Sequence, residues 1–167
     1  MKNLVLTGFM GTGKTTVGKI LAKKLGYRFV DSDAEIEKQE QKSINEIFAL
    51  SGEDGFREIE SRVIAELSEK SNSVIATGGG VVLRKENIDN LRKNGVVILL
   101  RADIHTIAQR LADKTDRPLA TGKSVQELEE KLAARESFYA YNDYAFDVED
   151  LSPMNVADRI IDLYKKL

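Results

Sequence analysis

The chain contains no cysteine, one histidine and only two prolines in 167 residues. The lack of cysteine excludes disulfide bonds, a thiolate nucleophile and cysteine-ligated zinc, and it fits a reducing compartment, so we expect a cytoplasmic protein. The few prolines exclude a proline-rich or disordered chain. No apolar run approaches the ~20 residues of a membrane span. The run at 4–10 is also too short and too interrupted for a signal peptide.

An excess of charge of one sign is missing as well, since 25 Lys and Arg stand against 27 Asp and Glu for a net charge of −2. Such a balance recruits neither a nucleic acid nor an anionic membrane, so we expect neither as a partner. Any anion site must therefore be local.

Short apolar runs along the chain predict five β-strands, and most of these runs are continuous, as is typical of parallel strands buried on both faces. Between them, apolar residues recur at helical spacing, and Ser43 with Glu46 predicts a capping box. The expected strands are 3–7, 28–31, 73–77, 96–101 and 145–148, and the expected helices are 15–25, 33–39, 43–50, 56–69, one after Asp103, 125–141 and one opening at Pro153. This alternation predicts one α/β domain with a parallel sheet and helices on both faces.

Residues 8–15, GFMGTGKT, have the spacing G-x-x-x-x-G-K-[ST] between an expected strand and an expected helix. Glycines let backbone N–H groups turn toward phosphate oxygens, and the helix N-terminus adds its positive dipole end. Lys14 is placed for the β- and γ-phosphates and the Thr15 hydroxyl for Mg²⁺. The loop predicts nucleotide binding, while hydrolysis, phosphoryl transfer and signalling all use it.

Two carboxylates, Asp31 and Asp33, follow the second strand at the edge where open α/β sheets bind ligands. One could hold Mg²⁺ through water while the other accepts a hydrogen bond from a substrate hydroxyl. Alternatively, they cap a helix and complement its dipole.

Arg57 and Glu60 stand three residues apart on an expected helix, close enough to pair. They form either an ordinary surface pair or an Arg fork, held by Glu60 and offered to a substrate carboxylate.

Three glycines, Gly78, Gly79 and Gly80, follow the third strand. They form either a flexible turn or a place where the backbone approaches a ligand with its N–H groups free to donate. That strand ends in Thr77, where many P-loop enzymes have an acidic residue, which shifts the metal-holding role toward Asp31.

The irregular segment 114–123 is either a surface connection or an active-site lid. If it is a lid, Arg117 would neutralise charge on the transferred phosphoryl group.

The order and approximate spacing of these motifs are similar to those of the shikimate kinase family over essentially the whole chain. The motifs are the loop at 8–15, Asp31-Ser32-Asp33, Phe56-Arg57 with Glu60, the triple glycine, Arg117-Pro118-Leu119 and Arg135. A P-loop alone is widespread, but this combination is specific to that family. The resemblance implies the three-layer fold of the nucleoside monophosphate kinases, with a five-stranded parallel sheet in the order 2-3-1-4-5. It also implies one kinase domain over 1–167, a mobile lid at about 112–124, a shikimate-binding segment at about 33–61, and a monomer.

The activity that the resemblance implies is transfer of the ATP γ-phosphoryl group to the 3-hydroxyl of shikimate, with Mg²⁺, on the route to chorismate. The alternatives are another small-molecule kinase of this fold, such as a gluconate kinase or a nucleoside monophosphate kinase, and a nucleotide-binding module that transfers no phosphate. ADP release with different acceptors distinguishes them.

The resemblance also assigns roles residue by residue. The implied catalytic residues are Lys14, Asp33 and Arg117, and the implied metal ligands are Thr15 and, through water, Asp31. Nucleotide contacts are implied for Gly11, Thr12, Gly13, Lys14, Thr15, Thr16, Arg110, Arg117 and Pro153. Substrate contacts are implied for Asp33, Arg57, Gly78, Gly79, Gly80 and Arg135, with Glu60 orienting Arg57.

Overall fold

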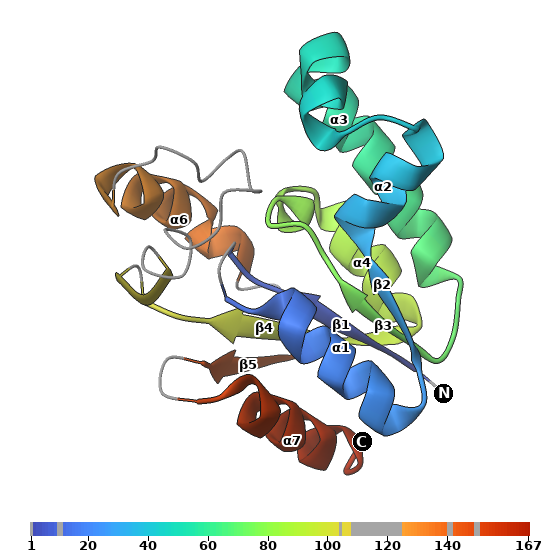
Figure 1. Ribbon diagram of the computed structural model, residues 1–167, viewed down its shortest axis with the longest axis vertical. Helices are drawn as coiled ribbons and strands as arrows, with labels where there is room; N and C mark the ends of the chain where they lie inside the picture. The colour runs from blue at the N-terminus through green and yellow to red at the C-terminus, as the bar shows by residue number, and fades with distance from the viewer. Residues whose placement is uncertain (1, 10–11, 104, 108–124, 140–141, 149–150) are drawn as a thin grey trace.

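The computed structural model describes residues 2–9, 12–103, 105–107, 125–139, 142–148 and 151–167 (Figure 1). Its strands are β1 (Asn3–Thr7), β2 (Arg28–Asp31), β3 (Ser73–Ala76), β4 (Gly95–Arg101) and β5 (Tyr144–Asp147). Its helices are α1 (Lys14–Leu25), α2 (Ser32–Glu40), α3 (Ile44–Ser68), the 3₁₀ turn η1 (Val81–Leu83), α4 (Lys85–Lys93), α6 (Val125–Tyr139) and α7 (Pro153–Tyr164).

The strands form one five-stranded sheet in the order β2-β3-β1-β4-β5, and every neighbouring pair is parallel. This confirms the expected sheet and its order. Because parallel strands end at the same edge, the residues that follow β1, β2 and β3 come together there.

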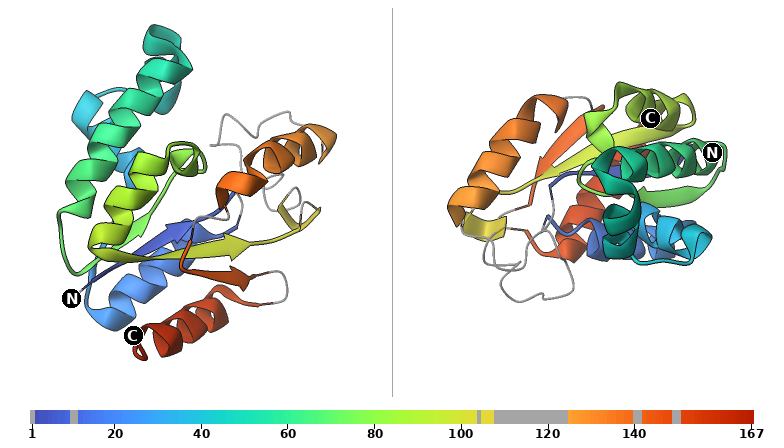
Figure 2. Two further views of the ribbon diagram at one scale, coloured as in Figure 1. Left: turned by 180° about the vertical axis from the view of Figure 1, so that it is seen from behind. Right: turned by 90° about the horizontal axis from the view of Figure 1, so that it is seen from above.

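Side chains alternate between the two faces of the sheet, as they must along a strand. Leu4 and Leu6 of β1 face a core shared with α1 and α7, whereas Val5 faces one shared with α3 and α4. Figure 2 shows these helices as two layers with the sheet between them. The continuous apolar runs of the sequence are thus explained by burial on both faces.

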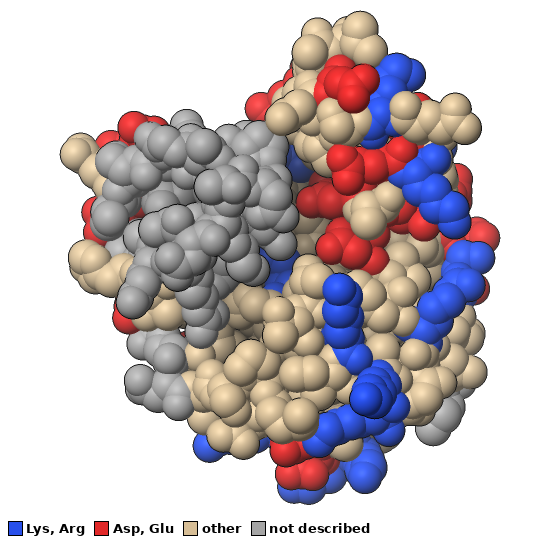
Figure 3. Space-filling model, viewed as in Figure 1, with Lys and Arg blue, Asp and Glu red and all other residues tan. Residues whose placement is uncertain are grey.

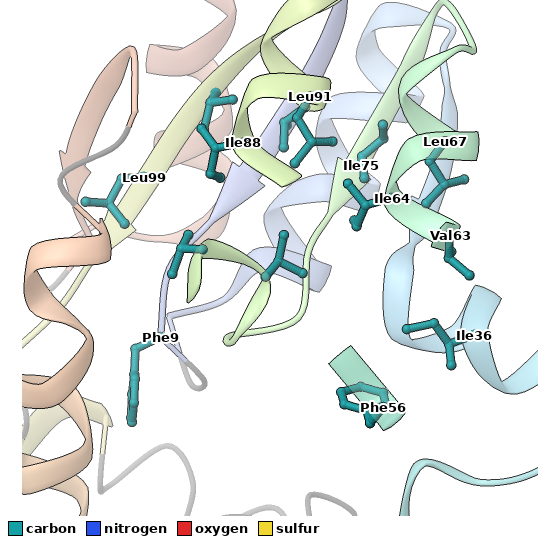
Figure 4. Packing of buried hydrophobic residues seen from close by; sticks show 14 of the residues in the cluster. Phe9, Ile36, Phe56, Val63, Ile64, Leu67, Ile75, Ile88, Leu91 and Leu99 are labelled. Carbon is teal, nitrogen blue, oxygen red and sulfur yellow. The ribbon is translucent and has the colours of Figure 1, made fainter. Parts of the chain in front are cut away.

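The core on the α3 side carries much of the apolar burial. Ile64 of α3 and Leu91 of α4 converge on Ile75 of β3 (Figure 4), and all three are at most 1 % exposed. Full burial of such a side chain contributes about 1.5–3 kcal/mol. This packing fixes α3, and with it Arg57, relative to the end of β3.

On the face of the sheet that α1 and α7 cover, Tyr27 and Tyr164 connect residues near the two ends of the chain. The Tyr164 hydroxyl donates to the main-chain oxygen of Lys2 at 2.6 Å and lies 2.9 Å from the Tyr27 hydroxyl. Burial and the hydrogen bond with Tyr27 raise the pKa of Tyr164, so its phenol stays protonated in the fold.

Two helical predictions need correction. The expected helices 43–50 and 56–69 are one helical run, α3, broken only at Gly52, where φ is 70° and ψ is −176°. The capping box of Ser43 and Glu46 at its start is confirmed. Helix α4 was not predicted, because Arg84 provides no side-chain cap and Lys85–Lys93 is mostly polar.

The expected lid at about 112–124 lies outside the described residues. Within the described part of the chain, no helix has the length and apolar character needed to span a bilayer.

Candidate active site

The loop after β1 turns sharply into α1. Gly8 has φ 141°, and a Cβ there would lie 2.5 Å from the Leu100 carbonyl oxygen, so only glycine fits. The buried Thr12 hydroxyl closes the loop by donating to the Phe9 carbonyl at 2.8 Å. Gly13, with φ 92°, is the N-cap of α1. Gly11, also expected to bind nucleotide, lies outside the described residues.

Lys14 is the first residue of α1, and it is only 7 % exposed. Its ammonium donates to the carbonyls of Gly8 at 2.5 Å and Phe9 at 3.0 Å, which holds the charge inside the loop. Thr15 and the exposed Thr16 follow in the first turn, which has no acidic residue to offset the positive end of the helix dipole. The loop therefore combines a cation, a helix N-terminus and backbone donors, as phosphate binding requires.

Asp31, at the end of β2, has two roles that its two oxygens keep separate. Oδ1 caps α2 by accepting from the N–H groups of Asp33 at 2.9 Å and Ala34 at 3.2 Å. Oδ2 accepts from the Thr15 hydroxyl at 3.3 Å. The predicted capping role of Asp31 is confirmed, and its contact with Thr15 leaves the predicted metal-holding role possible alongside it.

The oxygens of Thr15 and Asp31 form a donor set that suits Mg²⁺, which prefers one or two carboxylates together with substrate phosphates and water. Among the described residues, no three His, Cys, Asp or Glu side chains gather into a metal site. Thr77, also at this edge, is buried, and its hydroxyl donates to the Leu6 carbonyl at 3.0 Å.

The start of α2 is fastened to the glycine turn after β3. The buried Ser32 hydroxyl accepts from the Gly78 N–H at 3.0 Å. A Cβ on Gly78 would lie 2.6 Å from Oδ1 of Asp33, so the Asp33 carboxyl packs directly over this glycine. The expectation that the glycine N–H groups are free to donate is therefore wrong for Gly78, because Ser32 already uses that N–H.

Arg57 and Glu60 form a buried pair rather than a surface one. NH1 of Arg57 donates to Oε1 of Glu60 at 2.9 Å, and their side chains are 9 % and 1 % exposed. The guanidinium stacks 5.2 Å from the Phe56 ring centroid, and a Cβ on Gly80 would lie 2.5 Å from its Cζ atom. Gly78 and Gly80 thus leave room for Asp33 and Arg57, which flank the same short turn.

The structure describes only some of the remaining predicted site residues. Arg110 and Arg117 lie outside the described residues. Arg135 belongs to α6, and its side chain is likewise outside the description. Pro153 is the first residue of α7, after the Ser152 N-cap, and follows β5 at the same edge of the sheet.

Two residues that contribute to this site were not singled out from the sequence. Ser32 could have been found as the middle of the Asp31-Ser32-Asp33 motif. Glu53, whose Oε1 lies 3.5 Å from NH2 of Arg57, is signalled only by its spacing of four residues from Arg57.

The surface charge is uneven although the net charge is small. Acidic side chains gather over α2 and the adjoining part of α3, whereas Lys and Arg predominate over α1 (Figure 3). Beneath this surface lie two buried cations, Lys14 in the phosphate loop and Arg57, whose charge is paired with that of Glu60.

A phosphate-binding loop after the first strand of a β2-β3-β1-β4-β5 parallel sheet, with carboxylates and a buried arginine at the same edge, defines the class of P-loop kinases. A family model described as shikimate kinase matches residues 10–165. The chain belongs to the shikimate kinase family.

Relatives of known name agree with this assignment. The shikimate kinase of Thermodesulfovibrio yellowstonii is 49 % identical over 168 residues, covering 100 % of this chain and 97 % of the relative. That of Caldanaerobacter subterraneus is 48 % identical, covering 100 % and 98 %.

Solved structures agree as well. The shikimate kinase of Acinetobacter baumannii in complex with shikimate superposes with a TM-score of 0.93 at 35 % identity, covering 99 % of this chain and 94 % of the other. The enzyme from Aquifex aeolicus gives a TM-score of 0.85 at 31 % identity, covering 98 % and 96 %.

Proposed function

We propose that this chain transfers the γ-phosphoryl group of ATP to the 3-hydroxyl of shikimate, giving shikimate 3-phosphate and ADP. The observation that carries the proposal lies at the end of β3, beside the phosphate loop. There the Asp33 carboxyl packs over Gly78 and the Arg57 guanidinium packs over Gly80. Shikimate is a small ring with a carboxylate at one end and hydroxyls at the other. A carboxylate and an arginine flanking one short turn suit these two ends.

On the acceptor side, Arg57 binds the substrate carboxylate. A guanidinium holds several N–H donors in one plane, so Arg57 can pair with Glu60 through NH1 and donate to the substrate carboxylate through NH2, which lysine cannot reproduce. Glu60 fixes the guanidinium through the 2.9 Å bond to NH1, so little side-chain freedom is lost on binding. The predicted contacts of Gly79 and Arg135 would complete this side.

On the nucleotide side, Lys14 and the loop N–H groups hold the phosphates, and Pro153 with Arg110 borders the base. Thr15 and, through water, Asp31 would hold Mg²⁺, which when bound neutralises charge on the phosphate oxygens. The 3.3 Å contact between their oxygens supports this pairing.

The chemistry depends mainly on positioning. The acceptor hydroxyl oxygen bonds to the γ-phosphorus as the bond to the bridging oxygen of ADP breaks, through a loose transition state. Asp33 orients the hydroxyl and accepts its proton late in the step. Lys14 and Arg117 stabilise charge on the equatorial oxygens.

A coupled assay of ADP release tests the proposal. We expect rapid release with shikimate and slow release with gluconate, nucleoside monophosphates or no acceptor. Faster turnover with gluconate would favour the alternative kinase, and rapid release without any acceptor would indicate an ATPase.

We further infer one kinase domain over 1–167 that acts as a monomer, with a lid at about 112–124. The single five-stranded sheet, whose strands span residues 3–147, supports one domain. Sedimentation of the protein with and without ADP and shikimate measures its oligomeric state, and an obligate dimer would contradict it.

A further inference from the structure

The guanidinium of Arg57 has three nitrogens, and their surroundings differ. NH1 is committed to the buried carboxylate of Glu60 at 2.9 Å. Nε is buried and has no hydrogen-bond partner among the described residues. NH2 lies 3.5 Å from Oε1 of Glu53, in a part-buried contact. Of the three nitrogens, NH2 is the one whose partner is exposed to solvent, which makes it the nitrogen available to a substrate carboxylate.

Glu53 differs from Glu60 in how firmly it is held. Glu60 is 1 % exposed, whereas the Glu53 side chain is 64 % exposed and lies directly after the break in α3 at Gly52. At 3.5 Å and with Glu53 exposed to solvent, this contact gains little energy and Glu53 can exchange it for water. Glu60 is thus a fixed support, and Glu53 is a partner that can leave.

We propose that Glu53 is a stand-in for the substrate carboxylate: it occupies NH2 of Arg57 and must be displaced when the acid binds. The inference rests on the proposed function, in which Arg57 binds that carboxylate. Glu53 is then a positioning residue that keeps the guanidinium paired and lowers the affinity for the substrate.

The size of the effect follows from the 3.5 Å length of the contact and the exposure of Glu53. Breaking a weak ion pair four residues apart on a helix corresponds to about a twofold change in an equilibrium constant. Neutralising Glu53 also removes a negative charge close to the incoming carboxylate. Both effects act in the same direction, so Glu53→Gln should tighten shikimate binding by about two- to threefold at low ionic strength.

The test is the dissociation constant for shikimate, measured by titration calorimetry for the wild type, Glu53→Gln and Glu58→Gln. Glu58 is a matched control, because it is 74 % exposed, lies on the same helix and pairs with Arg84 at 2.9 Å instead of Arg57. Its neutralisation changes the net charge equally. We expect tighter binding only for Glu53→Gln, and the difference should shrink as salt screens the charges.

Unchanged or weaker binding by Glu53→Gln would overturn the proposal, and so would equal tightening in both variants, which would reflect general electrostatics. A gain in affinity cannot arise from a damaged fold, so a purely structural role for Glu53 would not produce it.

Arg57→Lys separates this proposal from the proposed function and keeps a cation beside Glu60. If Arg57 binds the substrate carboxylate, this variant weakens shikimate binding, and adding Glu53→Gln to it restores little. If Arg57→Lys binds shikimate like the wild type, the carboxylate assignment itself fails. If Arg57→Lys binds weakly but Glu53→Gln alone does not bind more tightly, only the stand-in role fails.

Discussion

Replacing Gly80 by alanine puts a methyl group where the guanidinium of Arg57 now lies. The added Cβ would approach Cζ to 2.5 Å, whereas ordinary van der Waals contact begins at 3.4 Å, so the guanidinium has to retreat by about 1 Å. That movement breaks or distorts the 2.9 Å bond to Glu60 and misplaces NH2 for its ligand. A hydrogen bond to a charged group contributes about 1.5–3 kcal/mol, so the KM for shikimate should rise about ten- to hundredfold.

Steady-state ADP release at saturating ATP measures this effect, with shikimate varied. Because the carboxylate is remote from the reacting hydroxyl and is bound alike in the ground and transition states, kcat should change much less than KM. A double-mutant cycle locates the cause. In an Arg57→Lys background, Gly80→Ala should cost clearly less than in the wild type, because the wide fork that the methyl group displaces is gone.

Two results would refute this reasoning. An unchanged KM in Gly80→Ala would mean that Arg57 accommodates the methyl group without losing its role. An equal cost in both backgrounds would mean that the methyl group disturbs the backbone rather than the guanidinium. Thermal unfolding of each variant checks that the fold survives.

Three further predictions concern Gly78, Lys14 and Tyr164. Gly78→Ala places a methyl group against the Asp33 carboxyl, so it should lower kcat by about 10²-fold with a smaller change in the KM for shikimate, as steady-state kinetics will measure. Lys14→Ala removes a preorganised cation at the phosphates and should lower kcat by about 10²–10³-fold, whereas a loss confined to the KM for ATP would contradict the role in transfer. Tyr164→Phe should lower the free energy of unfolding by about 1 kcal/mol at neutral pH, measured by urea denaturation. Because the fold raises the pKa of Tyr164, its contribution is present below pH ~10 and is lost as the pH rises further, so the variant should lose less stability in alkali than the wild type does.

The sheet could be predicted from the sequence because its signal is local. Continuous apolar runs mark strands buried on both faces, and β1 and β2 begin and end at the predicted residues. The phosphate loop could be predicted equally well, since its glycines and Lys14 all lie within residues 8–15. Helix α4 could not be predicted, because it has neither a capping side chain nor a long apolar stripe. Ile88 and Leu91 are its only buried apolar residues.

The pairing of Arg57 with Glu60 shows where sequence reasoning reaches its limit. Their spacing predicts contact but says nothing of burial, and burial decides whether the pair is an ordinary surface feature or a held fork. Burial here depends on Phe56 and on packing against β3, which is distant in the sequence. The family resemblance favoured the fork; the structure shows the buried pair that such a fork needs, and its contact with a substrate stays a prediction.

The triple glycine affects the site mainly through the space that its missing side chains leave. From the sequence, the glycines suggest backbone N–H groups offered to a ligand, but the N–H of Gly78 is already bound to Ser32. The space left by the absent Cβ atoms is instead filled by the Asp33 carboxyl and the Arg57 guanidinium. These glycines therefore shape the proposed acceptor site by letting two charged side chains from other elements lie close to the end of β3. Any side chain at position 78 or 80 acts first on Asp33 or Arg57, which is why the two alanine variants should separate kcat from KM.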